Sequence, residues 1–250
     1  MRWFFIGLAV LFIPAYLRAK SSKLVVLGKE NLPARPGYIL AANHLSYIDP
    51  LVMWIGMGPT TSFWMKTDIC LRPLDPALVL LCRVLFRVIP VDRKKPNLQS
   101  LVRQSRSALR HGWVGVFPEG TRSRVDGPTL QEGFAGVTVL ARRTGAPLIP
   151  VAIQGTTGFA NPFSPRGRTI TIAVGKPFAL PDRGSREGDT TKIFEAISEL
   201  LPQRMRGPYL SRRTDDRLLQ SGDSRRQCGL GSRDRPTEKT APHFGRLTTT

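Results

Sequence analysis

Short apolar runs alternate with amphipathic helical patterns through the middle of the chain, from about residue 24 to residue 201. The runs are rich in Val and Ile, and Gly, Pro or charged residues bound most of them, so we expect each to be a strand. Seven ranges fit this description: Leu24–Leu27, Tyr38–Ala42, Thr61–Met65, Val88–Val91, Val114–Phe117, Leu148–Ile153 and Thr169–Val174. Strands that alternate with helices predict an α/β domain, in which a mostly parallel sheet is flanked by helices.

Two further segments carry helical stripes of apolar or small residues. The first stripe consists of Leu98, Leu101, Val102, Ser105, Ala108 and Leu109. Arginines lie elsewhere around that segment, which predicts an amphipathic helix with a basic outer side. The second stripe consists of Ile193, Phe194, Ile197, Leu200 and Leu201. Because chemistry in such folds gathers in the loops that follow strands, we expect functional residues in those loops.

Composition narrows the class of protein. A length of 250 residues with a hydrophobic fraction of 41% suits one domain with a sizeable core. The three cysteines do not cluster, so they form neither a disulfide framework nor a zinc site, and this favours a reducing compartment. The 37 Lys and Arg residues outnumber the 18 Asp and Glu residues, which gives a net charge of +19. Such a charge implies polyanionic partners: nucleic acid, an anionic membrane surface or phosphorylated substrates.

The two ends of the chain differ from its middle. Residues 1–23 hold an apolar stretch from Trp3 to Leu17, followed by Arg18, Lys20 and Lys23. As a helix this stretch is roughly 22 Å long, shorter than the hydrocarbon core of a bilayer. We therefore expect a membrane-associated helix with a basic flank, the alternatives being a cleaved signal peptide and a buried core helix.

Residues 203–250 are rich in Arg, Ser, Gly, Asp and Thr and hold 11 basic residues against 5 acidic ones. No helical or strand period is visible there, so we expect a basic disordered tail. Residues 24–202 then form the globular domain. The tail accounts for +6 of the net charge of +19, so the domain itself stays basic.

The first candidate site follows the second expected strand. His44 lies just after Ala42, and Asp49 follows it by five residues. An imidazole is the usual general base near neutral pH, and a carboxylate that holds one ring nitrogen fixes its tautomer. Asp49 followed by Pro50 is also typical of a helix N-cap with Pro at the first helical position, which would leave His44 an ordinary loop residue.

The second candidate site follows the expected strand Val114–Phe117. The sequence from Phe117 to Ser123 places the carboxylate of Glu119, the hydroxyl of Thr121 and the guanidinium of Arg122 within one turn around Gly120. Arg binds phosphate bidentately, and Glu accepts hydrogen bonds from a polyol. The same residue types are also common in an ordinary solvated turn.

These two segments together resemble a known family. His44 and Asp49 at this spacing, with Phe-Pro-Glu-Gly-Thr-Arg-Ser from Phe117, resemble the PlsC-like glycerolipid acyltransferases, which include 1-acyl-glycerol-3-phosphate acyltransferases. Two further blocks, Arg87–Arg93 and Gly145–Ile153, match the family in the same order. The resemblance runs from about residue 43 to residue 153, and the four ordered blocks make it specific. It implies the fold of glycerol-3-phosphate acyltransferases.

The resemblance also implies roles for particular residues. His44 is expected to be the general base, and Asp49 is expected to orient it. Glu119, with Gly120 and Thr121 beside it, is expected to position the glycerol part of the acceptor. The acceptor's phosphate is expected to bind basic residues: Arg93, Arg122 and Lys66.

The implied reaction moves a fatty acyl group from acyl-CoA or acyl carrier protein to the free hydroxyl of 1-acyl-glycerol 3-phosphate, which makes phosphatidic acid. No Gly-x-Ser-x-Gly motif occurs, so we expect direct transfer without an acyl-enzyme. We expect no metal and no cofactor beyond the acyl donor, because no cluster of ligand residues stands out. The expected partners are a lysophospholipid acceptor, the acyl donor and a membrane lipid surface on the cytoplasmic side.

Other functions stay open on the sequence alone. The same chemistry could act on glycerol 3-phosphate or another lysolipid, because the four blocks do not specify the acceptor. A non-catalytic basic protein that binds membranes or nucleic acid would also explain the charge. The basic clusters lack interleaved aromatic residues and known nucleic-acid motifs, so no nucleic acid is expected as a partner.

Overall fold

The computed structural model describes residues 23–58, 60–67, 87–92, 94–95, 97–122, 129–158 and 167–209. The strands are β1 (Lys23–Leu27), β2 (Ile39–Ala42), β3 (Thr61–Lys66), β4 (Ile89–Val91), β5 (Trp113–Val116), β6 (Leu148–Gln154) and β7 (Thr169–Val174). The helices are α2 (Asp49–Met57), α5 (Leu98–Leu109), α6 (Gly136–Thr144) and α7 (Arg186–Glu199), with short 3-10 turns η1 (Lys29–Asn31) and η2 (Gln203–Met205). All seven expected strands are confirmed, and each boundary lies within one residue of the expected one.

The seven strands form one sheet in the order β1-β7-β6-β2-β5-β3-β4. Five of its neighbouring pairs are parallel, and only β6 and β7 run antiparallel. The prediction of a mostly parallel sheet in an α/β fold is therefore confirmed. Because β2, β5, β3 and β4 are consecutive and parallel in the sheet, their carboxyl ends lie next to one another along a single edge.

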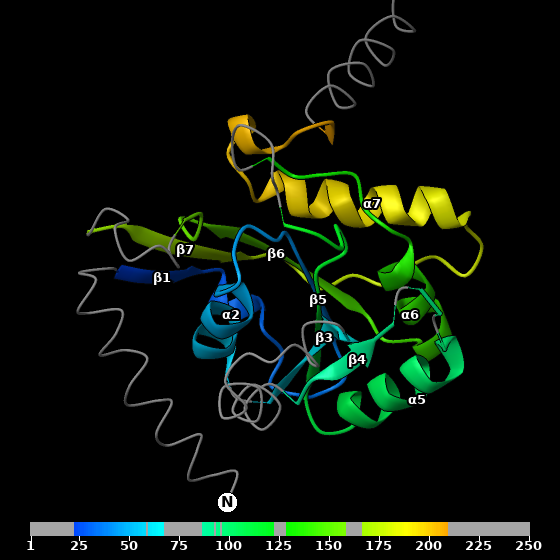
Figure 1. The fold of residues 1–250 in the computed structure, drawn as a ribbon. Helices are drawn as coiled ribbons and strands as arrows, with labels where there is room; N and C mark the ends of the chain where they lie inside the picture. Colours follow the sequence, from blue (N-terminus) through cyan, green and yellow to red (C-terminus); the bar gives the residue numbers. More distant parts are fainter. Residues whose placement is uncertain are drawn as a thin grey trace, which may run out of the picture. The chain divides into compact units, whose positions relative to one another are not determined.

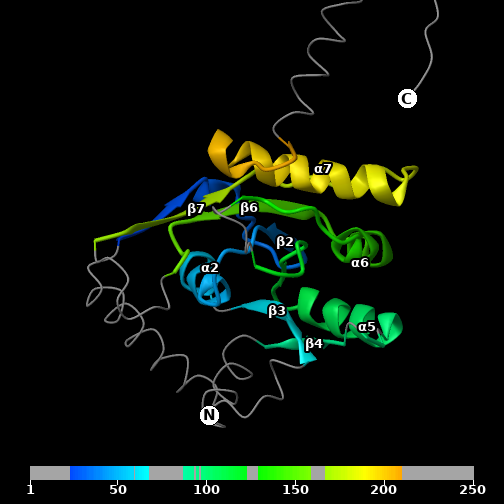
Figure 2. The ribbon, with the colours of Figure 1, turned by 45° about the horizontal axis from the view of Figure 1, so that its top comes forward.

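Helices cover both faces of the sheet, so the domain has three layers (Figures 1 and 2). On one face, α2 packs Val52, Met53 and Trp54 against alternate strand residues. On the other face, α5, α6 and α7 enclose a second apolar cluster. Strand β6 shows the alternation that this requires, because Ile149 faces the α2 side whereas Leu148 faces the opposite side.

The two expected helices are present as α5 and α7. In α5 the buried positions are Leu101, Ser105 and Leu109. The apolar residues of the second stripe belong to the core cluster on this face or pack against it, which confirms the stripe. Leu98 departs from the expected stripe, since 41% of its side chain is exposed. It is the first residue of α5, one full turn before the helix meets the core.

The domain extends further than expected at its end. Residues 203–209 were expected in the tail, but Gln203–Met205 form η2, and Met205 and Tyr209 are buried in the core. The ring of Tyr209 stacks on Phe194 of α7 at 5.2 Å, which attaches this segment to the domain. The expected boundary after residue 202 is therefore wrong by at least seven residues. The sequence did not reveal this extension, because two isolated apolar side chains produce no helical or strand periodicity.

Most of the remaining expectations about the two ends of the chain concern residues outside the described ranges. Residues 1–22, which hold the expected membrane helix, and residues 210–250 of the expected tail lie outside the described residues. Lys23, expected in the basic flank, is the first residue of β1. Within the described ranges, none of the helices is long and apolar enough to span a bilayer.

Candidate functional site

The candidate residues come together because their strands are neighbours. His44 follows β2, Glu119 and Arg122 follow β5, and Lys66 is the last residue of β3. Because β2, β5 and β3 are adjacent and parallel, these residues lie at one edge of the sheet. Arg93 comes two residues after β4 and lies outside the described residues. The candidate residues that the structure describes therefore lie at the carboxyl edge of the sheet, where α/β folds bind their ligands.

His44 and Asp49 form the centre of the site. The Nδ1 atom of His44 lies 2.8 Å from Oδ2 of Asp49, whose side chain is fully buried, whereas 18% of the His44 side chain is exposed. An imidazole held in this way through Nδ1 carries its proton there and leaves Nε2 unprotonated in the neutral form. Nε2 is then the atom that is able to take a proton from a substrate.

Asp49 is itself fixed by the loop that it faces. Its Oδ2 atom accepts hydrogen bonds from the backbone N–H groups of Leu45 and Ser46, both at 2.7 Å. Asp49 is the first residue of α2, and Ile48 is the cap, so the expected N-cap role of Asp49 is wrong by one position. The carboxylate points back to the loop between β2 and α2, residues 43–48, instead of capping the helix. We call this segment the histidine loop.

Stacked aromatic rings hold the other side of the imidazole. The ring of Phe117 stacks on His44 with centroids 4.3 Å apart, and Phe63 lies 6.1 Å beyond it. Phe63 stands opposite Gly115 in the β3–β5 register. A Cβ atom at Gly115 would lie 2.4 Å from the Phe63 ring, so glycine is required for this packing. His44 is therefore held between a carboxylate and a wall of aromatic side chains.

Glu119 lies beneath the histidine loop. Only 1% of its surface is exposed. Its Oε1 atom accepts a hydrogen bond of 2.7 Å from the backbone N–H of His44, and Oε2 accepts one of 3.0 Å from the backbone N–H of Gln131. Glu119 thus contacts the backbone at the histidine, and its side chain is shielded from solvent.

Burial changes the acidity of Glu119. Desolvation raises its pKa from 4.5 to about 7, and the nearby charge of Asp49 acts in the same direction. The two backbone hydrogen bonds favour the ionised form and limit the rise. A carboxyl group that titrates near neutral pH beside the histidine is a feature typical of functional sites.

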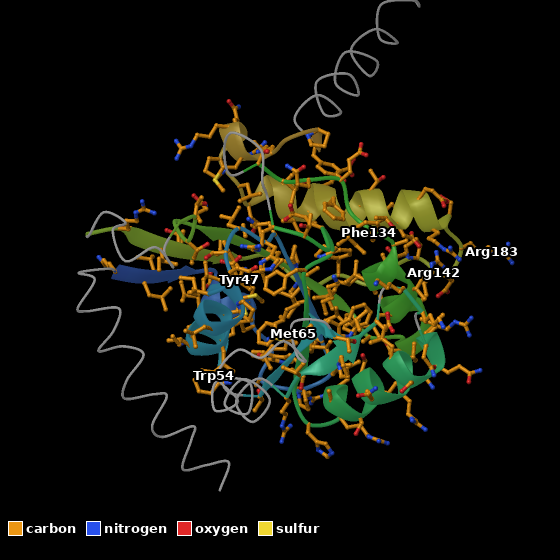
Figure 3. The ribbon with its side chains drawn as sticks, in the orientation of Figure 1. Tyr47, Trp54, Met65, Phe134, Arg142 and Arg183 are labelled. Atoms are coloured by element: carbon orange, nitrogen blue, oxygen red, sulfur yellow. The ribbon has the colours of Figure 1, made fainter. Side chains whose placement is uncertain are left out.

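Arg122 forms the outer part of the site with Tyr47. Gly120, at φ 64°, turns the chain back, and its N–H donates to the carbonyl of Phe117. The guanidinium of Arg122 lies 3.5 Å from the centre of the Tyr47 ring and donates to the Tyr47 hydroxyl at 2.7 Å. Tyr47 is 59% exposed and lies beside α2 (Figure 3). The cation is thus held at the surface, next to the histidine loop.

Some functional contacts were not expected from the sequence. The side chain of Asn43 joins β2 to β6, because Nδ2 donates to the carbonyl of Ile153 at 3.0 Å and Oδ1 accepts from its N–H at 2.7 Å. Tyr47 and Gln131 were not singled out either. An amide side chain directly after a buried strand and before His44 was the available signal for Asn43. Nothing local marks Tyr47 or Gln131.

This arrangement is able to remove a proton from a hydroxyl group and to bind an anion. An imidazole is able to act as a base, a carboxylate at its Nδ1 atom is able to stabilise an imidazolium, and Arg122 is a cation near the surface. A comparison with family models agrees with this chemistry: residues 23–154 match the Acyltransferase family. The chain belongs to this family. It is therefore an acyltransferase, and its match includes both candidate segments.

Similar proteins bear names that agree with the family. The chain is 28% identical over 182 residues to a 1-acyl-sn-glycerol-3-phosphate acyltransferase of Bacillus subtilis, a match that covers 70% of this chain and 86% of that protein. It is 29% identical over 150 residues to a probable 1-acyl-sn-glycerol-3-phosphate acyltransferase of Mycoplasma pneumoniae, a match that covers 58% of this chain but only 54% of that protein.

A solved structure supports the fold. The crystal structure of the 1-acyl-sn-glycerophosphate (LPA) acyltransferase PlsC from Thermotoga maritima matches 80% of this chain and 91% of that chain. The TM-score is 0.57 at 21% sequence identity. The two proteins therefore share the α/β fold of this acyltransferase.

Proposed function

We propose that this protein transfers a fatty acyl group from acyl-CoA or acyl carrier protein to the free hydroxyl of 1-acyl-glycerol 3-phosphate, forming phosphatidic acid. The observation that carries the proposal is the contact between Nδ1 of His44 and the buried carboxylate of Asp49. The names of the similar proteins support the choice of acceptor. The positive charge of the domain also suits an acceptor that carries a phosphate.

In the proposed mechanism, Nε2 of His44 removes the proton from the acceptor hydroxyl. The hydroxyl oxygen then forms a bond to the thioester carbonyl carbon, and the carbon–sulfur bond breaks after the tetrahedral intermediate. The imidazolium returns its proton to the leaving thiolate, so that a thiol and the new ester are released. Asp49 stabilises the imidazolium between these two proton transfers.

The acceptor's phosphate binds Arg122 in this proposal, because a guanidinium matches a phosphate group in geometry and charge. Gly120 and Thr121 line the same turn and lie beside the glycerol part. Lys66, at the end of β3, and Arg93, outside the described residues, are proposed as further cationic contacts. The reaction takes place at a lipid surface on the cytoplasmic side, with residues 1–23 associated with the membrane.

The experiment is an acyl-transfer assay with radiolabelled acyl-CoA and a panel of acceptors presented in mixed micelles. The panel contains 1-acyl-glycerol 3-phosphate, glycerol 3-phosphate and 1-acyl-glycerol-phosphocholine. The proposal expects labelled phosphatidic acid as the main product, with a kcat/KM for this acceptor at least about tenfold above the other two. Preference for either of the other acceptors, or the absence of transfer to all three, contradicts the proposal.

A further inference from the structure

Glu119 occupies a position that suits a different role from contact with the acceptor. Both of its oxygen atoms accept backbone hydrogen bonds, one from His44 and the other from Gln131. Its neighbours Thr121 and Arg122 are more accessible, whereas 99% of Glu119 is covered. An acceptor bound at the surface would meet the turn around Gly120 and not the carboxylate beneath it.

The two backbone groups that Glu119 joins belong to different segments. His44 follows β2, and Gln131 lies in the segment that leads to α6. That segment is held closely: the N–H of Phe134 donates to the carbonyl of Pro118 at 2.9 Å, and the N–H of Leu130 donates to the carbonyl of Met205 at 2.8 Å. Glu119 therefore connects the histidine loop to a segment that is anchored on the core.

The backbone of His44 is held by few other contacts in the described residues. Asp49 accepts from its ring and from the next two backbone N–H groups, and Phe117 stacks on its ring. Glu119 is the partner of its backbone N–H. Without that bond, His44 would keep its Asp49 and Phe117 contacts and Asn43 would stay joined to Ile153. The backbone of His44 would, however, lose its hydrogen bond to the turn after β5.

We propose that Glu119 is a positioning residue, whose carboxylate fixes the backbone of His44 relative to the β5 turn and does not contact the acceptor. This inference rests on the proposed function for its effect on catalysis. Each carboxylate oxygen is needed as an acceptor, because the two partners are both N–H donors. The Glu119 carboxylate interacts with the backbone N–H groups of His44 and Gln131 and with the negative charge of Asp49.

The substitution Glu119→Gln tests the proposal with little change of volume. The amide retains one oxygen, and its NH₂ group faces one of the two N–H donors, so at least one hydrogen bond is lost. We expect kcat to fall about 10- to 100-fold, because displacement of a catalytic group by a fraction of an ångström is costly. The KM for the acceptor is expected to change by less than about threefold.

The matched control is Glu132→Gln, because Glu132 is exposed, lies next to Gln131 and undergoes the same change of charge. Its kcat and KM are expected to equal those of the unmodified protein. An acceptor KM that rises tenfold in Glu119→Gln with kcat unchanged would overturn the proposal, since it would identify an acceptor ligand. Unchanged kcat and KM in Glu119→Gln would overturn it as well.

Hydrogen exchange supplies a second readout that does not depend on activity. In the full-length protein at pH 8, the amides of His44 and Gln131 are expected to be protected, and Glu119→Gln is expected to increase the exchange of at least one of them at least about tenfold. Retained protection of both amides overturns the proposal. If the unmodified protein transfers no acyl group, the proposed function fails, whereas the exchange result still decides whether Glu119 fixes this loop.

Discussion

The candidate site has a buried half and an exposed half, and the two differ in how their polar groups are satisfied. In the buried half, Asp49 and Glu119 are 0% and 1% exposed, and backbone N–H groups donate to Oδ2 of Asp49 and to both oxygens of Glu119 at 2.7–3.0 Å. In the exposed half, Arg122 contacts the ring and the hydroxyl of Tyr47, a residue that is itself 59% exposed. The first half is fixed by the fold, and the second half faces the solution.

This difference in burial suits the two halves to different functions, the orientation of a base and the binding of a phosphate. Buried carboxylates with several N–H donors have little freedom to move, which suits the orientation of a base. A partly exposed guanidinium at the surface is in contact with water, which suits the binding of a phosphate from solution. We therefore expect changes in the buried half to alter kcat or stability, and changes in the exposed half to alter the acceptor KM.

The largest expected effect is on the base itself. His44→Ala should lower kcat by about 10²- to 10⁴-fold, because the hydroxyl loses its general base. Steady-state acyl-transfer rates measure the loss, with His111→Ala as the matched control, since His111 is an exposed histidine in the turn after α5. Circular dichroism checks that both variants are folded. A folded His44→Ala protein with full activity would show that another group is the base.

The next effect concerns the pH dependence of stability. The folded pKa of Glu119, about 7, lies above its ordinary value of 4.5, so the folded state binds this proton more tightly than the unfolded chain does. The stabilisation is fully present below pH 4.5 and is lost as the pH rises through 7. Over this range it amounts to at most about 3 kcal/mol.

Urea unfolding at pH 5 and pH 8 measures this effect, with Glu119→Gln as the comparison, because the amide does not titrate. We expect the free energy of unfolding of the unmodified protein to fall relative to the variant between the two pH values. A difference that stays constant from pH 5 to pH 8 would mean that Glu119 ionises at its ordinary pKa, which would contradict its desolvated position.

A smaller effect is expected in the exposed half. Arg122→Ala should raise the KM for the phosphorylated acceptor about tenfold and change kcat by less than about threefold, because a charge-assisted hydrogen bond to phosphate is lost. Initial rates over a range of acceptor concentrations separate the two constants. Arg103→Ala, an exposed change on α5, controls for the loss of one positive charge. An equal rise of KM in both variants would indicate a general charge effect.

The smallest expected effect concerns Tyr47. Tyr47→Phe keeps the ring under the Arg122 guanidinium but removes the hydroxyl, so the acceptor KM should rise no more than about twofold. Tyr47→Ala removes both contacts and should raise the KM about three- to fivefold. The same rate measurements apply. A larger KM for Tyr47→Phe than for Tyr47→Ala would exclude the ring as a support for Arg122.

Contacts within the site differ in how far the sequence could predict them. His44 and Asp49 are five residues apart, so a strand exit followed by a helix start is enough to bring them together. Glu119 and His44, and Arg122 and Tyr47, are both 75 residues apart. These pairs depend on β2 and β5 being neighbours in the sheet, and the order of the strands is not encoded in any local pattern.

The strands themselves were predictable because each is a short run of mostly apolar residues, and the central strands β2, β5 and β6 are buried on both faces. The burial of Glu119 was not predictable, because its sequence neighbours are typical of a solvated turn. The end of the domain was also missed, since Met205 and Tyr209 are single apolar residues in a polar segment. Long-range packing decides such positions, whereas local periodicity predicts the strands and helices.

The most direct test of this account measures kcat and the acceptor KM for His44→Ala and Arg122→Ala in parallel, with radiolabelled acyl-CoA and 1-acyl-glycerol 3-phosphate. We expect His44→Ala to lower kcat at least about 100-fold with little change in KM, and Arg122→Ala to raise KM about tenfold with kcat within about threefold. A loss of kcat in Arg122→Ala as large as that in His44→Ala would contradict the separation of a buried catalytic half from an exposed binding half.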